Sequence, residues 1–177
     1  AQAFQPIAQV YPYPGWVEED LEEIWSAVIL VIEGAIDQAN IESNQIMALG
    51  ITNQRESVAI WEKDSGRPMA NLIVWQDRRT SAQCRLLQAK GYEMLVKQKT
   101  GLTIDPYFSA TKIAWLLNHY PHINELAQAG KAAFGTLDSY IIYKLAGKHV
   151  TDYSNASRTL LFDISQLEWD QELLEIF

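Results

Sequence analysis

An arginine and a glutamate stand side by side at Arg55 and Glu56, shortly after the apolar run Ile46 to Ile51. The guanidinium group offers a planar fork of N–H donors, and the carboxylate offers two acceptor oxygens. Donors and acceptors placed together in this way suit a small molecule that carries several hydroxyl groups. The alternative is a solvated ion pair at the start of a hairpin, which is the usual state of charged residues at a protein surface.

The position of this pair in the chain is compatible with a ligand site, although a surface ion pair is the commoner case. The run QIMALGIT, from Gln45, is short and apolar and predicts a buried strand. Open α/β sheets bind their ligands beyond the carboxyl ends of the strands, where Arg55 and Glu56 would then lie. Neighbouring side chains in a strand point to opposite faces, so both can reach one ligand only if the strand ends or turns there.

Two aromatic residues could complete such a site. Trp75 closes the apolar run NLIVW, and its ring could pack on the carbon atoms of a polyol while its N–H meets a hydroxyl. A core tryptophan at a strand end is the alternative. Tyr107 follows Asp105 and Pro106 just before a predicted helix, where its phenol could reach a cleft. The alternative is a buried contact at the entry of that helix.

Other kinds of site lack the residues that they need. The sequence contains no phosphate-binding P-loop and no G-x-G-x-x-G run. The three histidines lack metal-ligand spacing to cysteines, so we expect no metal site in this chain. Cys84 lies in a predicted helix without a nearby histidine and is expected to pack rather than to act as a nucleophile.

The composition is that of an ordinary globular domain, with 177 residues, 48% hydrophobic and 20% charged. The net charge of −8 argues against nucleic acid and against an anionic membrane surface as partners. No apolar run reaches the length of a membrane span, and we expect no signal peptide. A single cysteine excludes an internal disulfide and favours the reducing cytoplasm.

Helical and strand patterns alternate along the chain. Residues 1–10 are expected to be extended, and a helix to run from Asp20, its N-cap, to about Asn40, with Glu23 completing a capping box. With the strand predicted from Gln45, this helix suggests a strand–helix–strand unit with a right-handed crossover. The runs SVAIWEK and ANLIVW flank KDSGRP and predict a hairpin.

The second half of the chain continues the alternation. Two helices are predicted around Gly91: one from Thr80 or Ser81 to Ala89, and a shorter one that ends at about Lys99. Four more are predicted: Ser109 to His119, Ile123 to Ala129, one capped by Asp138 that ends at Gly147, and one that begins at Trp169 or Asp170. Short strands are predicted over AAFGT and RTLLFDI. The pattern predicts an α/β domain with a mixed sheet flanked by helices.

The two ends of the sequence lead us to expect a piece of a longer chain. It begins at Ala1 without a methionine, in a segment that resembles the continuation of a strand, and it ends at Phe177 inside a helical pattern. A processed or cloned complete domain is the alternative.

Several runs, taken together, resemble the FGGY family of carbohydrate kinases. They are GITNQRES with VWQDRRT, and YFSATKIAWLLNH, which fits the first signature pattern of the family at every constrained position. The runs PGWVEEDLEEIW, GTLDSYIIYKLAG and TDYSNASRTLLFDI extend the similarity over nearly the whole chain. Within the family, the NQRE and VWQD residues point to glycerol rather than xylulose, gluconate or ribulose.

The resemblance implies a fold and an activity. The family has two actin-like, ribonuclease H-like domains that close on a cleft, and it transfers the terminal phosphate of ATP to a polyol or sugar hydroxyl with Mg²⁺. Residues 1–177 would be a fragment of the N-terminal domain of an enzyme that converts glycerol to glycerol 3-phosphate. Arg55, Glu56, Trp75 and Tyr107 would contact glycerol, and homo-oligomers are common in the family.

Some of the family's working parts have no counterpart in this sequence. The phosphate-binding hairpin with Asp-x-Gly-Thr would precede residue 1, and the catalytic aspartate and the C-terminal domain would follow Phe177. We therefore expect no catalytic residue in this chain and no activity from it alone. Two other readings are a kinase for another polyol or ketose, such as xylulokinase, and a non-catalytic binding domain on the same scaffold.

Overall fold

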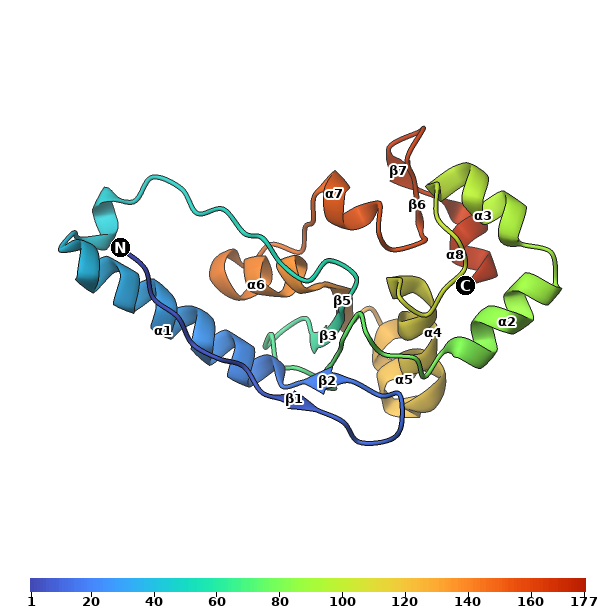
Figure 1. Ribbon diagram of the computed structural model, residues 1–177, viewed down its shortest axis with the longest axis horizontal. Coiled ribbons are helices and arrows are strands. Elements are labelled where there is room, and N and C mark those ends of the chain that lie inside the picture. The colour runs from blue at the N-terminus through green and yellow to red at the C-terminus, as the bar shows by residue number, and fades with distance from the viewer.

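Strand β3 (Val58–Glu62) is an inner strand of the five-stranded sheet in the computed structural model, which describes residues 1–177 (Figure 1). It pairs with β4 (Leu72–Ile73) on one side and with β5 (Ala132–Thr136) on the other. Two short strands, β1 (Gln9–Val10) and β2 (Glu18–Glu19), extend the sheet in the order β1-β2-β4-β3-β5. All these pairings are antiparallel, where the sequence predicted a mixed sheet.

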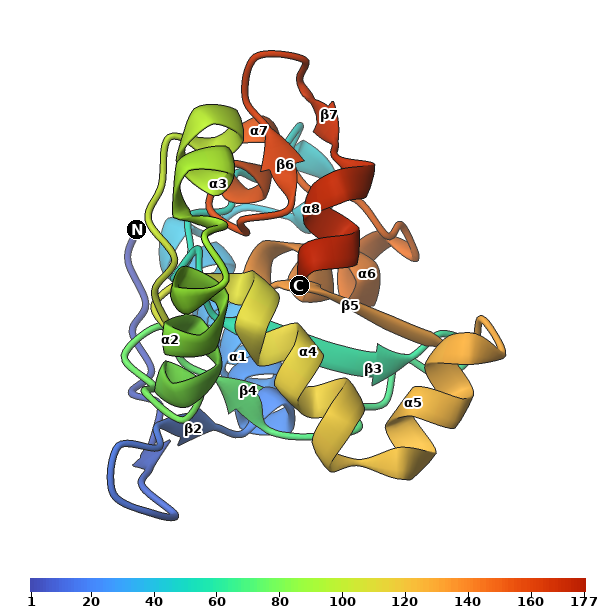
Figure 2. The ribbon, with the colours of Figure 1, turned by 90° about the vertical axis from the view of Figure 1, so that its right-hand side faces the viewer.

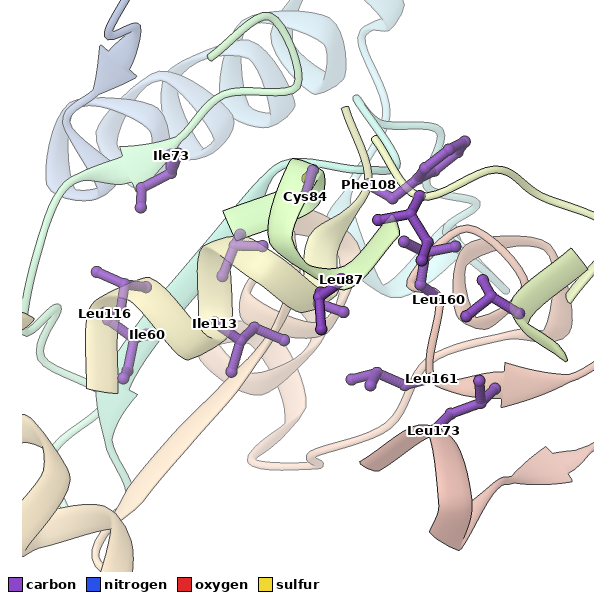
Figure 3. Packing of buried hydrophobic residues seen from close by; sticks show 14 of the residues in the cluster. Ile60, Ile73, Cys84, Leu87, Phe108, Ile113, Leu116, Leu160, Leu161 and Leu173 are labelled. Atoms are coloured by element: carbon purple, nitrogen blue, oxygen red, sulfur yellow. The ribbon is translucent and has the colours of Figure 1, made fainter. Parts of the chain in front are cut away.

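Helices cover both faces of the sheet because β3 is apolar on both sides. Val58 and Ile60 face one hydrophobic cluster, and Ala59 and Trp61 face another, as the two-residue period of a strand requires. The first cluster joins β3 to α2 (Ser81–Ala89), α3 (Glu93–Thr100) and α4 (Ser109–His119). Figure 3 shows it from close by, and Figure 2 shows α4 lying along β3. The second cluster packs α1 (Leu21–Ala39) and α6 (Leu137–Ala146) on the opposite face.

The remaining elements are short. They are the 3₁₀ turn η1 (Ser43–Gln45), α5 (Pro121–Gln128), α7 (Tyr153–Ala156), β6 (Phe162–Asp163), β7 (Glu168–Trp169) and α8 (Gln171–Ile176). The predicted α/β class, the hairpin and the helices of the second half are confirmed. None of the helices combines the length and apolar character required to cross a bilayer.

The helix predicted from Asp20 is confirmed, but the capping box is not. The Asp20 carboxylate accepts from the main-chain N–H groups of Glu22 and Glu23, as an N-cap does. The Glu23 side chain accepts instead from the main-chain N–H of Ala8. This contact ties the extended first residues to the beginning of α1.

The predicted buried strand from Gln45 is wrong. Residues 46–54 form a coil that returns from the end of α1 toward β3 (Figure 1); residues 46–50 are exposed, and Met47 fully so. A strand needs a neighbour to complete its main-chain hydrogen bonds. No strand of this chain lies beside these residues, so neither the strand nor the predicted crossover unit forms.

Two predictions in the last third of the chain also need correction. The strand expected over RTLLFDI contains only β6, which pairs with β7 in a small separate hairpin. Asp138 does not cap α6, because Thr136 occupies the N-cap position. The Asp138 carboxylate accepts instead from the hydroxyl groups of Thr136 and Thr151.

Candidate functional site

The buried carboxylate of Glu56 is the centre of the candidate site. Its residue is 3% exposed, and Arg158 Nε donates to Oε1 over 2.7 Å. A guanidinium nitrogen of Arg55 lies 4.0 Å from the same oxygen. Oε2 has no hydrogen-bond partner in the protein, so one oxygen is held and the other is free to accept from a ligand.

The turn before β3 sets the direction of both charged side chains. Arg55 and Glu56 lie in this turn, not beyond the end of a strand as the sequence predicted. The main-chain carbonyl of Glu56 accepts from Ser109 Oγ at 3.2 Å and from Lys112 Nζ at 3.3 Å, both on α4. With the turn fixed in this way, the Arg55 side chain stays 46% exposed while Glu56 is buried beside it.

Trp75 and Tyr107 form an aromatic pair in this region. Their ring centroids are 5.5 Å apart in an edge-to-face arrangement. Trp75 is 36% exposed, which excludes the alternative of a core tryptophan. Its main-chain N–H donates to Ser57 Oγ at 3.0 Å.

Tyr107 combines the two roles that the sequence left open. Its ring packs against the hydrophobic core beside α4, and its main-chain N–H donates to Asp105 Oδ1 at 2.8 Å. Asp105 is held in turn by both terminal nitrogens of Arg78. The phenol oxygen makes no hydrogen bond within the protein, so it can donate to or accept from a ligand.

Arg158 belongs to this cluster, and sequence reasoning missed it. Besides its bond to Glu56, its guanidinium carbon lies 5.9 Å from the Tyr107 ring and 5.0 Å from the Phe108 ring. The residue is 102 positions from Glu56 along the chain. Its place inside the run NASRT, which carries part of the family resemblance, was the one available signal.

Contacts between neighbours therefore connect all four predicted ligand residues. They run from Trp75 to Tyr107, then to Arg158, Glu56 and Arg55. The cluster presents a free carboxylate oxygen, guanidinium donors, a phenol and an exposed ring. Groups of these kinds can bind a hydroxylated molecule, because hydroxyl groups both donate and accept while carbon atoms pack on apolar surface.

A separate cavity of about 380 Å³ is lined by residues of α4, β5, α6, β7 and α8 and of the loops between them. Its walls are largely apolar and include Phe134, Leu161 and Trp169. Ser109, which binds the Glu56 carbonyl, is also part of its lining. None of the four predicted ligand residues lines this cavity.

The chain is an α/β domain in which a cluster of charged and aromatic side chains surrounds the turn before β3. The family described as the FGGY family of carbohydrate kinases, N-terminal domain, matches residues 1–177, and the chain belongs to this family. The chain is 52% identical over 176 residues to a glycerol kinase of Geobacillus kaustophilus (strain HTA426), covering 98% of this chain and 36% of the relative. It is 54% identical over 169 residues to a glycerol kinase of Thermococcus kodakarensis, covering 96% and 34%.

Solved structures agree with this assignment. A crystal structure of Plasmodium falciparum glycerol kinase with ADP matches with a TM-score of 0.92 and 37% identity, over 98% of this chain and 35% of that one. A ligand-bound xylulose kinase of Lactobacillus acidophilus matches with a TM-score of 0.85 and 27% identity, over 97% and 34%. The chain thus spans about a third of the length of the proteins it matches.

Proposed function

We propose that the full-length protein containing this chain phosphorylates glycerol to glycerol 3-phosphate with ATP. In this proposal residues 1–177 are a fragment of the N-terminal kinase domain and supply much of the wall that binds glycerol. The observation that carries the proposal is the buried Glu56 carboxylate, held through one oxygen and free at the other, beside an exposed aromatic pair. Identities of 52–54% to relatives named glycerol kinase support glycerol as the substrate.

Each residue of the wall has a distinct task in the proposal. Glu56 Oε2 accepts from one or two glycerol hydroxyls, while Arg55 donates to a hydroxyl from the exposed side. Trp75 packs its ring on the carbon chain, and Tyr107 hydrogen-bonds through its phenol. Arg158 holds the Glu56 carboxylate in its orientation through the hydrogen bond from Nε to Oε1.

ATP and Mg²⁺ belong to the full-length enzyme in this proposal. Among residues 1–177 no three His, Cys, Asp or Glu side chains lie together so as to hold a metal ion. The part of residues 1–177 in this proposal is to bind and orient the accepting hydroxyl. Positioning of this kind is a large part of phosphoryl-transfer catalysis.

The proposal also includes a cytoplasmic location and a homo-oligomer. A single, buried cysteine is what a reducing compartment favours. The oligomeric state rests on family resemblance alone.

A kinase for another polyol or ketose is the second candidate, because the match to xylulose kinase also covers nearly the whole chain. A substrate panel with the full-length protein separates the two. Glycerol-dependent formation of ADP from ATP supports the proposal. Turnover of xylulose without turnover of glycerol would refute it, and no turnover of any polyol would favour a binding domain.

Calorimetry tests the site itself. Glu56→Ala or Arg55→Ala should raise the Kd for glycerol about tenfold to a hundredfold, since a hydrogen bond to a charged group contributes about 1.5–3 kcal/mol. Glu33→Ala and Arg85→Ala are matched controls, because both residues are exposed and make no ion pair. Unchanged affinity in the first two variants would remove Arg55 and Glu56 from the site.

A further inference from the structure

Lys112 is a fully buried lysine without a carboxylate partner. It lies on α4 with no exposed surface and forms no ion pair. Its ammonium group donates instead to three main-chain carbonyls, those of Tyr107 at 2.6 Å, Phe108 at 3.0 Å and Glu56 at 3.3 Å. A lysine ammonium has three N–H donors, so all of them are used.

Two of these carbonyls belong to predicted ligand residues on separate segments of the chain. Glu56 lies in the turn before β3, and Tyr107 lies in the loop before α4. Ser109 Oγ also binds the Glu56 carbonyl, but it does not reach Tyr107. Lys112 is therefore the side chain that binds the main chains of both segments.

Packing alone does not account for a lysine at this position. An unpaired ammonium is costly to bury, and an apolar side chain of similar length would fill the same space. The three hydrogen bonds to carbonyls offset part of this cost, and they fix the main-chain groups that accept them. Charge-assisted hydrogen bonds are short and directional, as the 2.6 Å contact with Tyr107 illustrates.

We infer that Lys112 is a positioning residue of the polyol site, which sets the distance between the Glu56 carboxylate and the Tyr107 phenol by binding both main chains. The inference rests on the proposed function, because it assigns a task in glycerol binding. Lys112 itself does not touch the substrate.

The protonation of Lys112 makes this task depend on pH. Burial lowers the pKa of Lys112 to about 7, although Asp77, Glu56, Cys84 and Asp105, the titratable groups around it, act in the opposite direction. A neutral amine has only two N–H donors and a lone pair. Above pH 7 one carbonyl therefore loses its donor, and we expect glycerol affinity to fall.

The stability of the folded protein should change with pH in the opposite direction to the glycerol affinity. The ordinary pKa of 10.5 applies to the unfolded chain, so between about pH 7 and 10.5 the unfolded state binds more protons at Lys112 than the folded state does. The free energy of unfolding therefore rises with pH in that window. If Lys112 served stability alone, glycerol affinity would rise with it or stay constant.

The test measures the Kd for glycerol by calorimetry on the full-length protein without ATP, from about pH 6 to about pH 9. We expect the Kd of the wild type to rise about tenfold over this range. The Lys112→Met variant should bind glycerol about tenfold more weakly than the wild type already at about pH 6. Its Kd should not change as the pH passes through 7. Leu116→Ala, a core change on the same helix, should lower stability but leave the Kd unchanged.

The outcomes separate the two proposals. A wild-type Kd that stays constant over the whole pH range overturns the positioning role, and so does wild-type affinity in Lys112→Met. If Lys112→Met does not fold, the wild-type pH series still decides. If the wild type binds no glycerol at any pH, the proposed function itself fails.

Discussion

Replacing Arg158 with alanine removes the cation closest to the Glu56 carboxylate. Arg158 Nε lies 2.7 Å from Glu56 Oε1, and the two side chains are 26% and 4% exposed. Without this bond the carboxylate must be ordered when glycerol binds, and ordering one side chain costs about 0.5–1.5 kcal/mol. The hydrogen bond to a charged group contributes about 1.5–3 kcal/mol, part of which solvent replaces at a side chain that is a quarter exposed.

We therefore expect Arg158→Ala to weaken glycerol binding by about 1–2 kcal/mol, which is about fivefold to thirtyfold in Kd. Calorimetry on the full-length protein measures this difference directly. Arg85→Ala is the matched control, since Arg85 is an exposed arginine on α2 without an ion pair.

A double-mutant cycle decides whether Arg158 acts through Glu56. If it does, Arg158→Ala combined with Glu56→Gln should bind glycerol about as weakly as Glu56→Gln alone. Effects that add instead would mean that Arg158 contacts glycerol independently. An unchanged Kd in Arg158→Ala would contradict the reasoning altogether.

Three further predictions concern other parts of the chain. Trp75→Ala should raise the Kd for glycerol about tenfold, through loss of apolar contact, while Trp75→Phe retains most of the affinity. The isolated chain should self-associate through the exposed run 46–51, and Met47→Lys with Leu49→Lys should reduce the associated fraction in analytical ultracentrifugation; a monodisperse wild-type monomer would exclude this. Asp170→Ala should lower the melting temperature near neutral pH, because the Lys99 side chain binds the Asp170 carboxylate and lowers its pKa. That stabilisation is present above the ordinary pKa of 3.8 and is lost as the pH falls through the lower folded value, so the two melting curves should converge in acid.

The helices and the central hairpin could be predicted because their signals are local. Apolar residues recur at helical spacing in α1, and Asp20 caps that helix through groups two and three residues away. The run from Gln45 carries an equally clear local signal and still forms no strand. Strand formation depends on a partner strand, and the apolar pattern of one segment does not say whether that partner is present.

The residues of the candidate site could be named from the sequence, but their connections could not. Arg55 and Glu56 are adjacent in sequence, Trp75 closes the run NLIVW, and Tyr107 begins the run YFSATKIAWLLNH. Arg158 carries no local signal, since its partner Glu56 lies 102 positions earlier. Lys112 appears in sequence as one more residue of an amphipathic helix, and its burial under two loops follows only from the packing of α4 on β3.

The loops that carry the site are fixed by side chains bound to the main chain rather than by regular structure. Ser57 holds the main chain of Trp75, Asp105 holds that of Tyr107, and Ser109 and Lys112 hold that of Glu56. Ser57 and Ser109 are short and polar, Asp105 and Lys112 are charged, and none of these anchors needs to reach a ligand. Substitutions at the anchors should therefore change glycerol affinity with little change in the chemistry of the wall. For the same reason, the proposed function implies that the residues which determine glycerol binding extend beyond those that contact glycerol.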